Sequence, residues 1–219
     1  MDALHAQWDR MGPEVLFEAA QTSHERGEIE DALSRLEWLS SHHASARVRF
    51  ELGKVLELFR DYEGAIVQYE LLVDSWPDSA EAPRARFRRT LCLQDLNEHR
   101  RALRAIKRLA RAADLDEENA AVVGLIQGSS EIALGRSRRG VSRINLALTQ
   151  LESTDRSWHR ARAHIWLMKH LVRESRGLSL KREKRSLINQ PERLRLLEMA
   201  EAQLVEINKL QIPEFTVQG

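Results

Sequence analysis

Residues 61–83, DYEGAIVQYELLVDSWPDSAEAP, contain the clearest structural pattern in the chain. The apolar side chains of this stretch recur at intervals of three and four, at Tyr62, Ala65, Ile66, Tyr69, Leu72, Val73 and Trp76. This spacing places them on one face of an α-helix, because the apolar residues of a half-buried strand would alternate with a period of two. Pro77 lacks a backbone N–H and ends the helix. One such helix cannot bury its apolar face alone, so the pattern predicts further copies.

The pattern recurs along most of the chain. A small residue marks each second helix, at Ala32, Ala65, Ala102 and Gly140, with spacings of 33, 37 and 38 residues. These anchors define units at about 13–44, 46–79, 83–114 and 121–153, and the turns between paired helices fall at Gly27, Arg60, Asn97 and Gly135. Arginine adopts the left-handed backbone conformation poorly, so the turn at Arg60 is expected to be wound differently.

This arrangement resembles the tetratricopeptide repeat (TPR), whose period is about 34 residues. The resemblance implies an all-α fold, a right-handed α-solenoid of four to five helical hairpins with a C-terminal capping helix. We expect an N-terminal arm or cap at 1–12, four repeats at 13–153, a divergent fifth hairpin with a basic loop and capping helix at 154–210, and a tail at 211–219. Within the fifth hairpin, Gly177 is expected to end one helix. Pro191 is expected to begin the last helix, with Leu194, Leu197, Ala200, Leu204, Ile207 and Leu210 on its apolar side.

The resemblance also implies that the first helix of each unit lines a concave groove. The fifth position of the first helix is Phe17, Phe50, Phe87 and Leu125 in successive units, and Lys54 follows Phe50 by four positions. The asparagine of the family's clamp for C-terminal carboxylates is missing from every unit, so that clamp is not predicted. The rings instead predict an apolar groove for a partner peptide or amphipathic helix. The alternative is that they pack between the two helices of a unit, because a register shift of one residue turns them inward.

Positive charge concentrates in the third unit. The basic patch consists of Arg84, Arg88, Arg100, Arg101, Arg104, Lys107, Arg108 and Arg111. Guanidinium groups bind carboxylates and phosphates, so this patch predicts an acidic protein surface, nucleic acid or anionic lipid as partner. The alternative is a solvated helix face. Aromatic residues make up 5% of the chain, which disfavours RNA recognition by base stacking.

Charge is divided unevenly between the two ends of the chain. Residues 1–80 hold sixteen Asp and Glu against seven Lys and Arg, a net charge of −9, whereas residues 81–219 have a net charge of +10. Opposite charges at the two ends favour head-to-tail contacts, so a homo-oligomer is a further alternative.

The composition gives no sign of a membrane span or a signal peptide. No apolar run approaches 18 residues, and the first ten residues lack a basic start followed by an apolar core. The chain as given is therefore expected to be cytoplasmic, or periplasmic if an export leader has been removed.

The chain contains no motif of a catalytic site. It lacks a glycine-rich phosphate loop, a Gly-x-Ser-x-Gly elbow, a cysteine pair and a His-Glu-x-x-His metal motif, so we expect neither an enzyme nor a bound cofactor or metal. The pattern Tyr-x-x-Ala-Ile-x-x-Tyr-x-x-Leu within residues 62–86 resembles bacterial envelope TPR proteins, namely the outer-membrane assembly lipoprotein and the Tol–Pal coordinator. The resemblance implies a non-catalytic scaffold or adaptor in a bacterial multiprotein assembly, with nucleic-acid or anionic-surface binding through the third repeat as the alternative.

Overall fold

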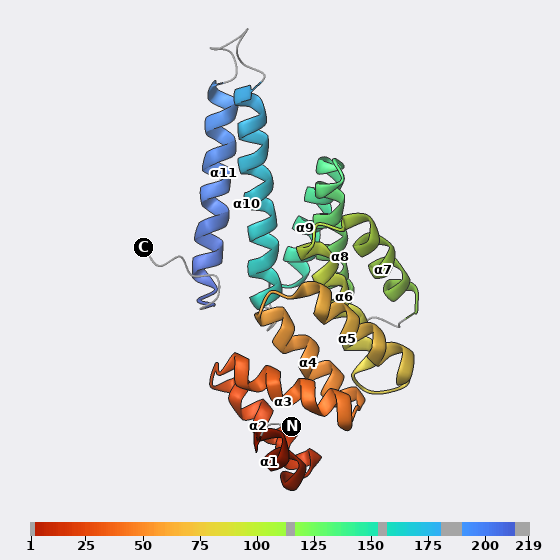
Figure 1. The fold of residues 1–219 in the computed structure, drawn as a ribbon. Coiled ribbons are helices and arrows are strands. Elements are labelled where there is room, and N and C mark those ends of the chain that lie inside the picture. Colours follow the sequence, from red (N-terminus) through yellow and green to blue (C-terminus); the bar gives the residue numbers. More distant parts are fainter. Residues whose placement is uncertain (1–2, 113–116, 153–156, 181–189, 213–219) are drawn as a thin grey trace. The chain divides into compact units, whose positions relative to one another are not determined.

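The computed structural model describes residues 3–112, 117–152, 157–180 and 190–212, and all of its regular structure in these ranges is helical. The helices are α1 (Ala3–Met11), α2 (Pro13–Glu25), α3 (Ile29–His42), α4 (Ala46–Leu58), α5 (Tyr62–Ser75), α6 (Ala82–Asp95), α7 (His99–Ala112), α8 (Glu117–Ala133), α9 (Ser137–Gln150), α10 (Ser157–Leu180) and α11 (Gln190–Lys209) (Figure 1). No helix in the described ranges is long and apolar enough to cross a membrane. The basic loop predicted at 178–190 is shorter than expected, because α10 continues to Leu180 and α11 begins at Gln190. Residues 181–189 of that loop and residues 213–219 of the predicted tail lie outside the described ranges.

The chain forms two compact units, residues 1–105 and residues 106–219, and the division falls inside α7. In the first unit, α2 pairs with α3 and α4 pairs with α5, while α3 packs on α4 and α5 on α6. The predicted helix at 62–76 is confirmed as α5, and its face carrying Ala65, Tyr69 and Leu72 is fully buried. Successive hairpins of residues 1–105 therefore share one continuous apolar core, and the helices confirm the predicted all-α fold.

The turn between paired helices has the same conformation in the four places where the structure describes it. The second residue after each first helix has positive φ: 76° at Gly27, 63° at Arg60, 60° at Asn97 and 82° at Gly135. In each case the next backbone N–H donates to a carbonyl five residues earlier, for example Asp61 N to Leu56 O at 2.9 Å. The expectation that Arg60 winds this turn differently is wrong. The energy of closing the hairpin outweighs the cost of a left-handed arginine, which is about 1–2 kcal/mol.

The segment before the first repeat contains α1. Its Trp8 is buried, and its ring makes an edge-to-face contact with the ring of Trp38 on α3 at a centroid distance of 6.2 Å. An aromatic pair in this geometry contributes about 0.5–1.5 kcal/mol beyond its area burial. Residues 7–11 thus cover apolar surface of the first hairpin, which is what the open end of a solenoid needs.

The second unit contains two hairpins, α8 with α9 and α10 with α11, and α10 also packs on α8 and α9 (Figure 1). Glycine lets α8 and α9 approach closely, because a Cβ at Gly140 would lie 2.5 Å from the carbonyl oxygen of Gly128. The prediction that Gly177 ends a helix is wrong, since α10 continues to Leu180. Pairing with α11 supports α10 along its length and offsets the low helix propensity of glycine, which costs about 1 kcal/mol.

The last helix buries only part of its predicted apolar side. In α11, Ala200 and Ile207 are buried, whereas Leu194 and Leu197 are exposed. Only the first turns of α11 depart from the predicted side, because Arg193 and Leu196 are half-buried there in place of Leu194 and Leu197. Further along the chain, Leu204 and Leu210 are half-buried on the predicted side.

Candidate functional site

Within residues 1–105, the first helices of successive repeats lie next to one another, since α2 contacts α4 and α4 contacts α6. Arg47, Phe50 and Lys54 follow one another at i, i+3 and i+7 on α4, so they share one side of that helix. On α6, Arg84 and Phe87 have the same spacing. We call the surface that carries Arg47, Lys54 and Arg84 the first-helix face.

The phenylalanines predicted to line the groove are covered largely by the chain itself. Phe17 is 4% exposed and Phe50 is 5% exposed, while Leu125 in the second unit is buried and Phe87 is half-buried. The guanidinium carbon of Arg47 lies 4.8 Å above the ring centroid of Phe17, and that of Arg84 lies 4.7 Å above the ring of Phe50. The surface presented at these two points is therefore cationic, and the aromatic rings lie beneath it.

A buried carboxylate joins α2 to α4 just beside this face. Glu51 accepts hydrogen bonds from Lys54 Nζ at 2.8 and 2.9 Å, and its Oε1 lies 2.8 Å from His24 Nδ1. Burial by itself would raise the pKa of Glu51, but the hydrogen bonds and positive charges of Lys54 and His24 hold that pKa below its ordinary value. Lys54 is thus committed to an internal ion pair, and its ammonium is less available to a ligand than its position suggested.

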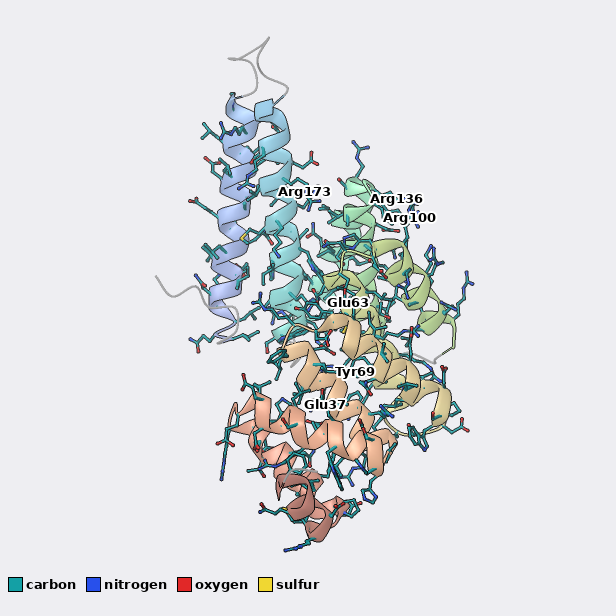
Figure 2. The ribbon with its side chains drawn as sticks, viewed as in Figure 1. Glu37, Glu63, Tyr69, Arg100, Arg136 and Arg173 are labelled. Atoms are coloured by element: carbon teal, nitrogen blue, oxygen red, sulfur yellow. The ribbon has the colours of Figure 1, made fainter. Side chains whose placement is uncertain are left out.

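A second, half-buried carboxylate joins α4, α5 and α6. Glu57 accepts two hydrogen bonds from Arg88, at 2.8 and 3.0 Å, and a third from the Tyr69 hydroxyl at 2.6 Å. Burial and the adjacent Glu57 charge raise the pKa of the Tyr69 phenol far above its ordinary range. Tyr69, labelled in Figure 2, is fully buried. Arg88 therefore fastens neighbouring repeats together at this point.

The predicted basic patch separates into residues with different surroundings. Arg84 covers Phe50, Arg88 pairs with Glu57, and Arg101 pairs with Glu98. The other members are exposed on α7 and form no ion pair with any residue that the structure describes; they are Arg100, Arg104, Lys107, Arg108 and Arg111. We call these five residues the α7 stripe, and Figure 2 labels Arg100 at its start.

Arg47 belongs to the first-helix face but was not singled out from the sequence. The signal that could have found it is the spacing Arg-x-x-Phe, which occurs at Arg47/Phe50 and again at Arg84/Phe87. In an aligned repeat this spacing places an arginine near the phenylalanine of the preceding unit. Among the described residues, no group of three or more His, Cys, Asp or Glu is arranged to hold a metal ion.

Comparison with known proteins shows what this fold resembles. No family model matches the sequence, and no curated protein matches it. Among solved structures, MamA from Desulfovibrio magneticus RS-1 is similar with a TM-score of 0.58 and 17% identity, over 92% of this chain and 97% of that one. A TPR protein from Parabacteroides merdae has a TM-score of 0.59 and 15% identity, over 93% of this chain and 80% of that one. YrrB, described as a TPR protein with an unusual peptide-binding site, has a TM-score of 0.55 and 14% identity, over 96% of this chain and 99% of that one. The chain has the fold of a TPR solenoid.

Proposed function

We propose that this protein is a non-catalytic interaction scaffold that binds a segment of a partner protein along the first-helix face. The observation that carries the proposal is the pair of arginines, Arg47 and Arg84, presented at equivalent positions of consecutive repeats. Most of the side-chain surface of Arg47 is exposed, and its nearest acidic group, Glu14, lies 3.8 Å away and is itself 81% exposed. An exposed pair at this distance contributes little, so the guanidinium retains donors for a ligand.

The comparisons are consistent with this proposal. The YrrB structure is described as having a peptide-binding site, and it shares the fold over nearly the whole of both chains. Consecutive first helices offer an extended segment a row of equivalent contact points, one per repeat. A role in a bacterial multiprotein assembly, which the envelope resemblance of residues 62–86 implies, remains part of the proposal.

Site-specific photo-crosslinking in the source cells tests which surface meets the partner. Gln21 occupies the position on α2 that corresponds to Lys54, so a benzoylphenylalanine at position 21 is expected to form an adduct with one defined protein. The matched control is the same residue at position 67, because Val67 is 50% exposed on the second helix α5. Adducts from position 67 and none from position 21 would contradict the assignment of the face.

A second candidate function rests on the α7 stripe. Five exposed cations without an ion pair to any described residue are suited to phosphates of nucleic acid or of anionic lipid. Binding of duplex DNA at low salt is the test, with Arg100→Glu, Arg104→Glu and Arg108→Glu combined as the variant. This candidate requires affinity to fall with salt by a slope of about 0.9 per phosphate contacted, and to vanish in the variant. Absence of binding at low salt excludes it.

A further inference from the structure

Two arginine–phenylalanine stacks repeat at the same step of the solenoid. Counted from the repeat starts at 13, 46 and 83, an arginine at the second position of one repeat lies over the phenylalanine at the fifth position of the preceding repeat. Arg47 lies over Phe17, and Arg84 lies over Phe50. The corresponding residue of the fourth repeat is Val122, so in sequence the series ends after the third repeat. The repetition shows that the contact belongs to the repeat itself and is not an isolated surface coincidence.

A guanidinium that lies over a ring is held ready for an anion. Its flat face lies against the ring, which contributes a cation–π energy of about 0.5–1 kcal/mol at exposed sites. Its N–H donors lie at the edge of the group, where they can still bind an acceptor. The ring also restricts the rotamers of a long side chain, which reduces the entropy that binding would otherwise cost. A planar carboxylate accepts two parallel N–H bonds from such an edge.

The two stacked arginines are poorly compensated by the protein's own acids. Arg84 is exposed and forms no ion pair with any described residue, and Arg47 has only the loose contact with Glu14. The strong acceptors between these helices are already used, because Glu51 is paired with Lys54 and His24, and Glu57 with Arg88. A partner that carries carboxylates would therefore supply what the face lacks.

We propose that the occupant of the first-helix face is an acidic protein segment, whose Asp or Glu side chains bind the guanidinium groups of Arg47 and Arg84. This deepens the proposed function and rests on it. The binding groups are side-chain carboxylates along the segment, so a free C-terminus is not required. Single-stranded nucleic acid is disfavoured, because the rings that would stack with bases are buried beneath the arginines.

The test uses the full chain and defined peptides. The probe is a labelled twelve-residue peptide of alternating Glu and Ser with both ends blocked, and its counterpart has Gln in place of Glu. Fluorescence polarisation is expected to show saturable binding of the Glu peptide and at least about tenfold weaker binding of the Gln peptide, the loss typical of a charge-assisted bidentate contact.

Two conservative variants separate a built site from general charge attraction. Arg84→Lys keeps the charge but loses the planar guanidinium with its paired N–H donors, and Phe50→Leu keeps an apolar side chain but loses the ring. Each variant is expected to bind the Glu peptide about three- to tenfold more weakly. Arg138→Lys, at an exposed position on α9, is the control and should change nothing. Because Arg84 is exposed, its variant remains informative even if Phe50→Leu perturbs folding.

Several results would overturn the inference. The Glu peptide could fail to bind saturably, the Gln peptide could bind equally well, or Arg84→Lys could keep full affinity. Binding that requires a free C-terminus would also overturn it, as would preferential binding of a single-stranded oligonucleotide at the same face. Crosslinking from position 21 together with any of these results would leave the proposed scaffold function standing and reject its acidic partner.

Discussion

Arg60 shows how much a repeat can demand of a single residue. Its φ of 63° lies where glycine is favoured, and its hydrogen bonds match those of the turn at Gly27. We expect Arg60→Gly to raise the free energy of unfolding by about 0.5–1 kcal/mol, because relief of the left-handed strain exceeds the entropy that glycine adds to the unfolded chain. Thermal unfolding followed by circular dichroism measures this change.

Arg26 provides the matched control for Arg60. It is exposed and precedes the turn glycine of the first hairpin, but its φ is −80°. Arg26→Gly therefore relieves no strain and is expected to lower stability slightly. If both glycine variants moved the midpoint in the same direction, the strain argument at Arg60 would be wrong.

The Glu51 cluster makes stability depend on pH. Because the folded-state pKa of Glu51 lies below the ordinary carboxyl value of 4.5, its stabilisation is present above that value and is lost as pH falls through the folded-state pKa. Lys54→Met removes the main partner and leaves burial to dominate. We expect a loss of about 1–3 kcal/mol at neutral pH and an acid-unfolding midpoint shifted to higher pH.

An acid titration of helical circular dichroism checks this prediction. Lys169→Met is the control, because Lys169 is exposed on α10 and has no ion pair with a described residue. An acid midpoint that stays unchanged in Lys54→Met would show that Glu51 does not depend on this partner.

Single residues were the least predictable level from sequence. The phenylalanine column was recognised, but the arginines that cover it come from the next repeat, about thirty positions further on. Local periodicity does not report such contacts. In the same way, the basic residues of the third unit read as one patch, whereas Arg88 is drawn inward by Glu57 and Tyr69.

At the scale of helices, local signals performed well where they included both a period and a stop. The stretch at 62–76 has both, and α5 ends at Ser75, two residues before Pro77. Gly177 was misread as a stop because glycine ends a helix only when the backbone turns left-handed there. The packing of α11 against α10 keeps that residue within the helix, and this contact is not visible in the local sequence.

The α8–α9 hairpin offers a test of close helix approach. A Cβ at Gly128 would lie 2.8 Å from the carbonyl oxygen of Gly140 and 2.6 Å from Ile144, so the two backbones would have to separate. We expect Gly128→Ala to destabilise the second unit by about 2–3 kcal/mol despite the better helix propensity of alanine. Hydrogen exchange of α8 and α9 peptides, followed by mass spectrometry, would show faster exchange there.

Gly124 on the same helix is the control for this prediction. A Cβ at Gly124 would meet Ala147 at 3.4 Å, which is ordinary contact. Gly124→Ala is therefore expected to be neutral or to slow exchange in α8. Equal protection in the Gly128 and Gly124 variants would remove close backbone approach as the reason for glycine at position 128.

At the scale of the whole molecule, the fold class followed from the register of four weak signals. No single unit was convincing, but anchors 33, 37 and 38 residues apart leave few alternatives to a helical repeat. The division of the chain at Ala105 and Ile106 was not evident, because it falls inside a continuous helix whose sequence pattern does not change there.

The separation of charge along the chain leads to the last prediction. Residues 1–80 have a net charge of −9 and residues 81–219 a net charge of +10, and the α7 stripe has no ion pair with any described acid. Copies of the chain are therefore expected to associate at low ionic strength and to separate as salt shortens the screening length from about 30 Å at 0.01 M to about 3 Å at 1 M. Sedimentation velocity at both salt concentrations measures this.

Arg100→Glu, Arg104→Glu and Arg108→Glu combined should abolish the association, whereas the same charge change at Arg160, Arg173 and Arg176 on α10 should not. A monomer at both ionic strengths, or equal loss in the two variants, would mean that the α7 stripe is a solvated face.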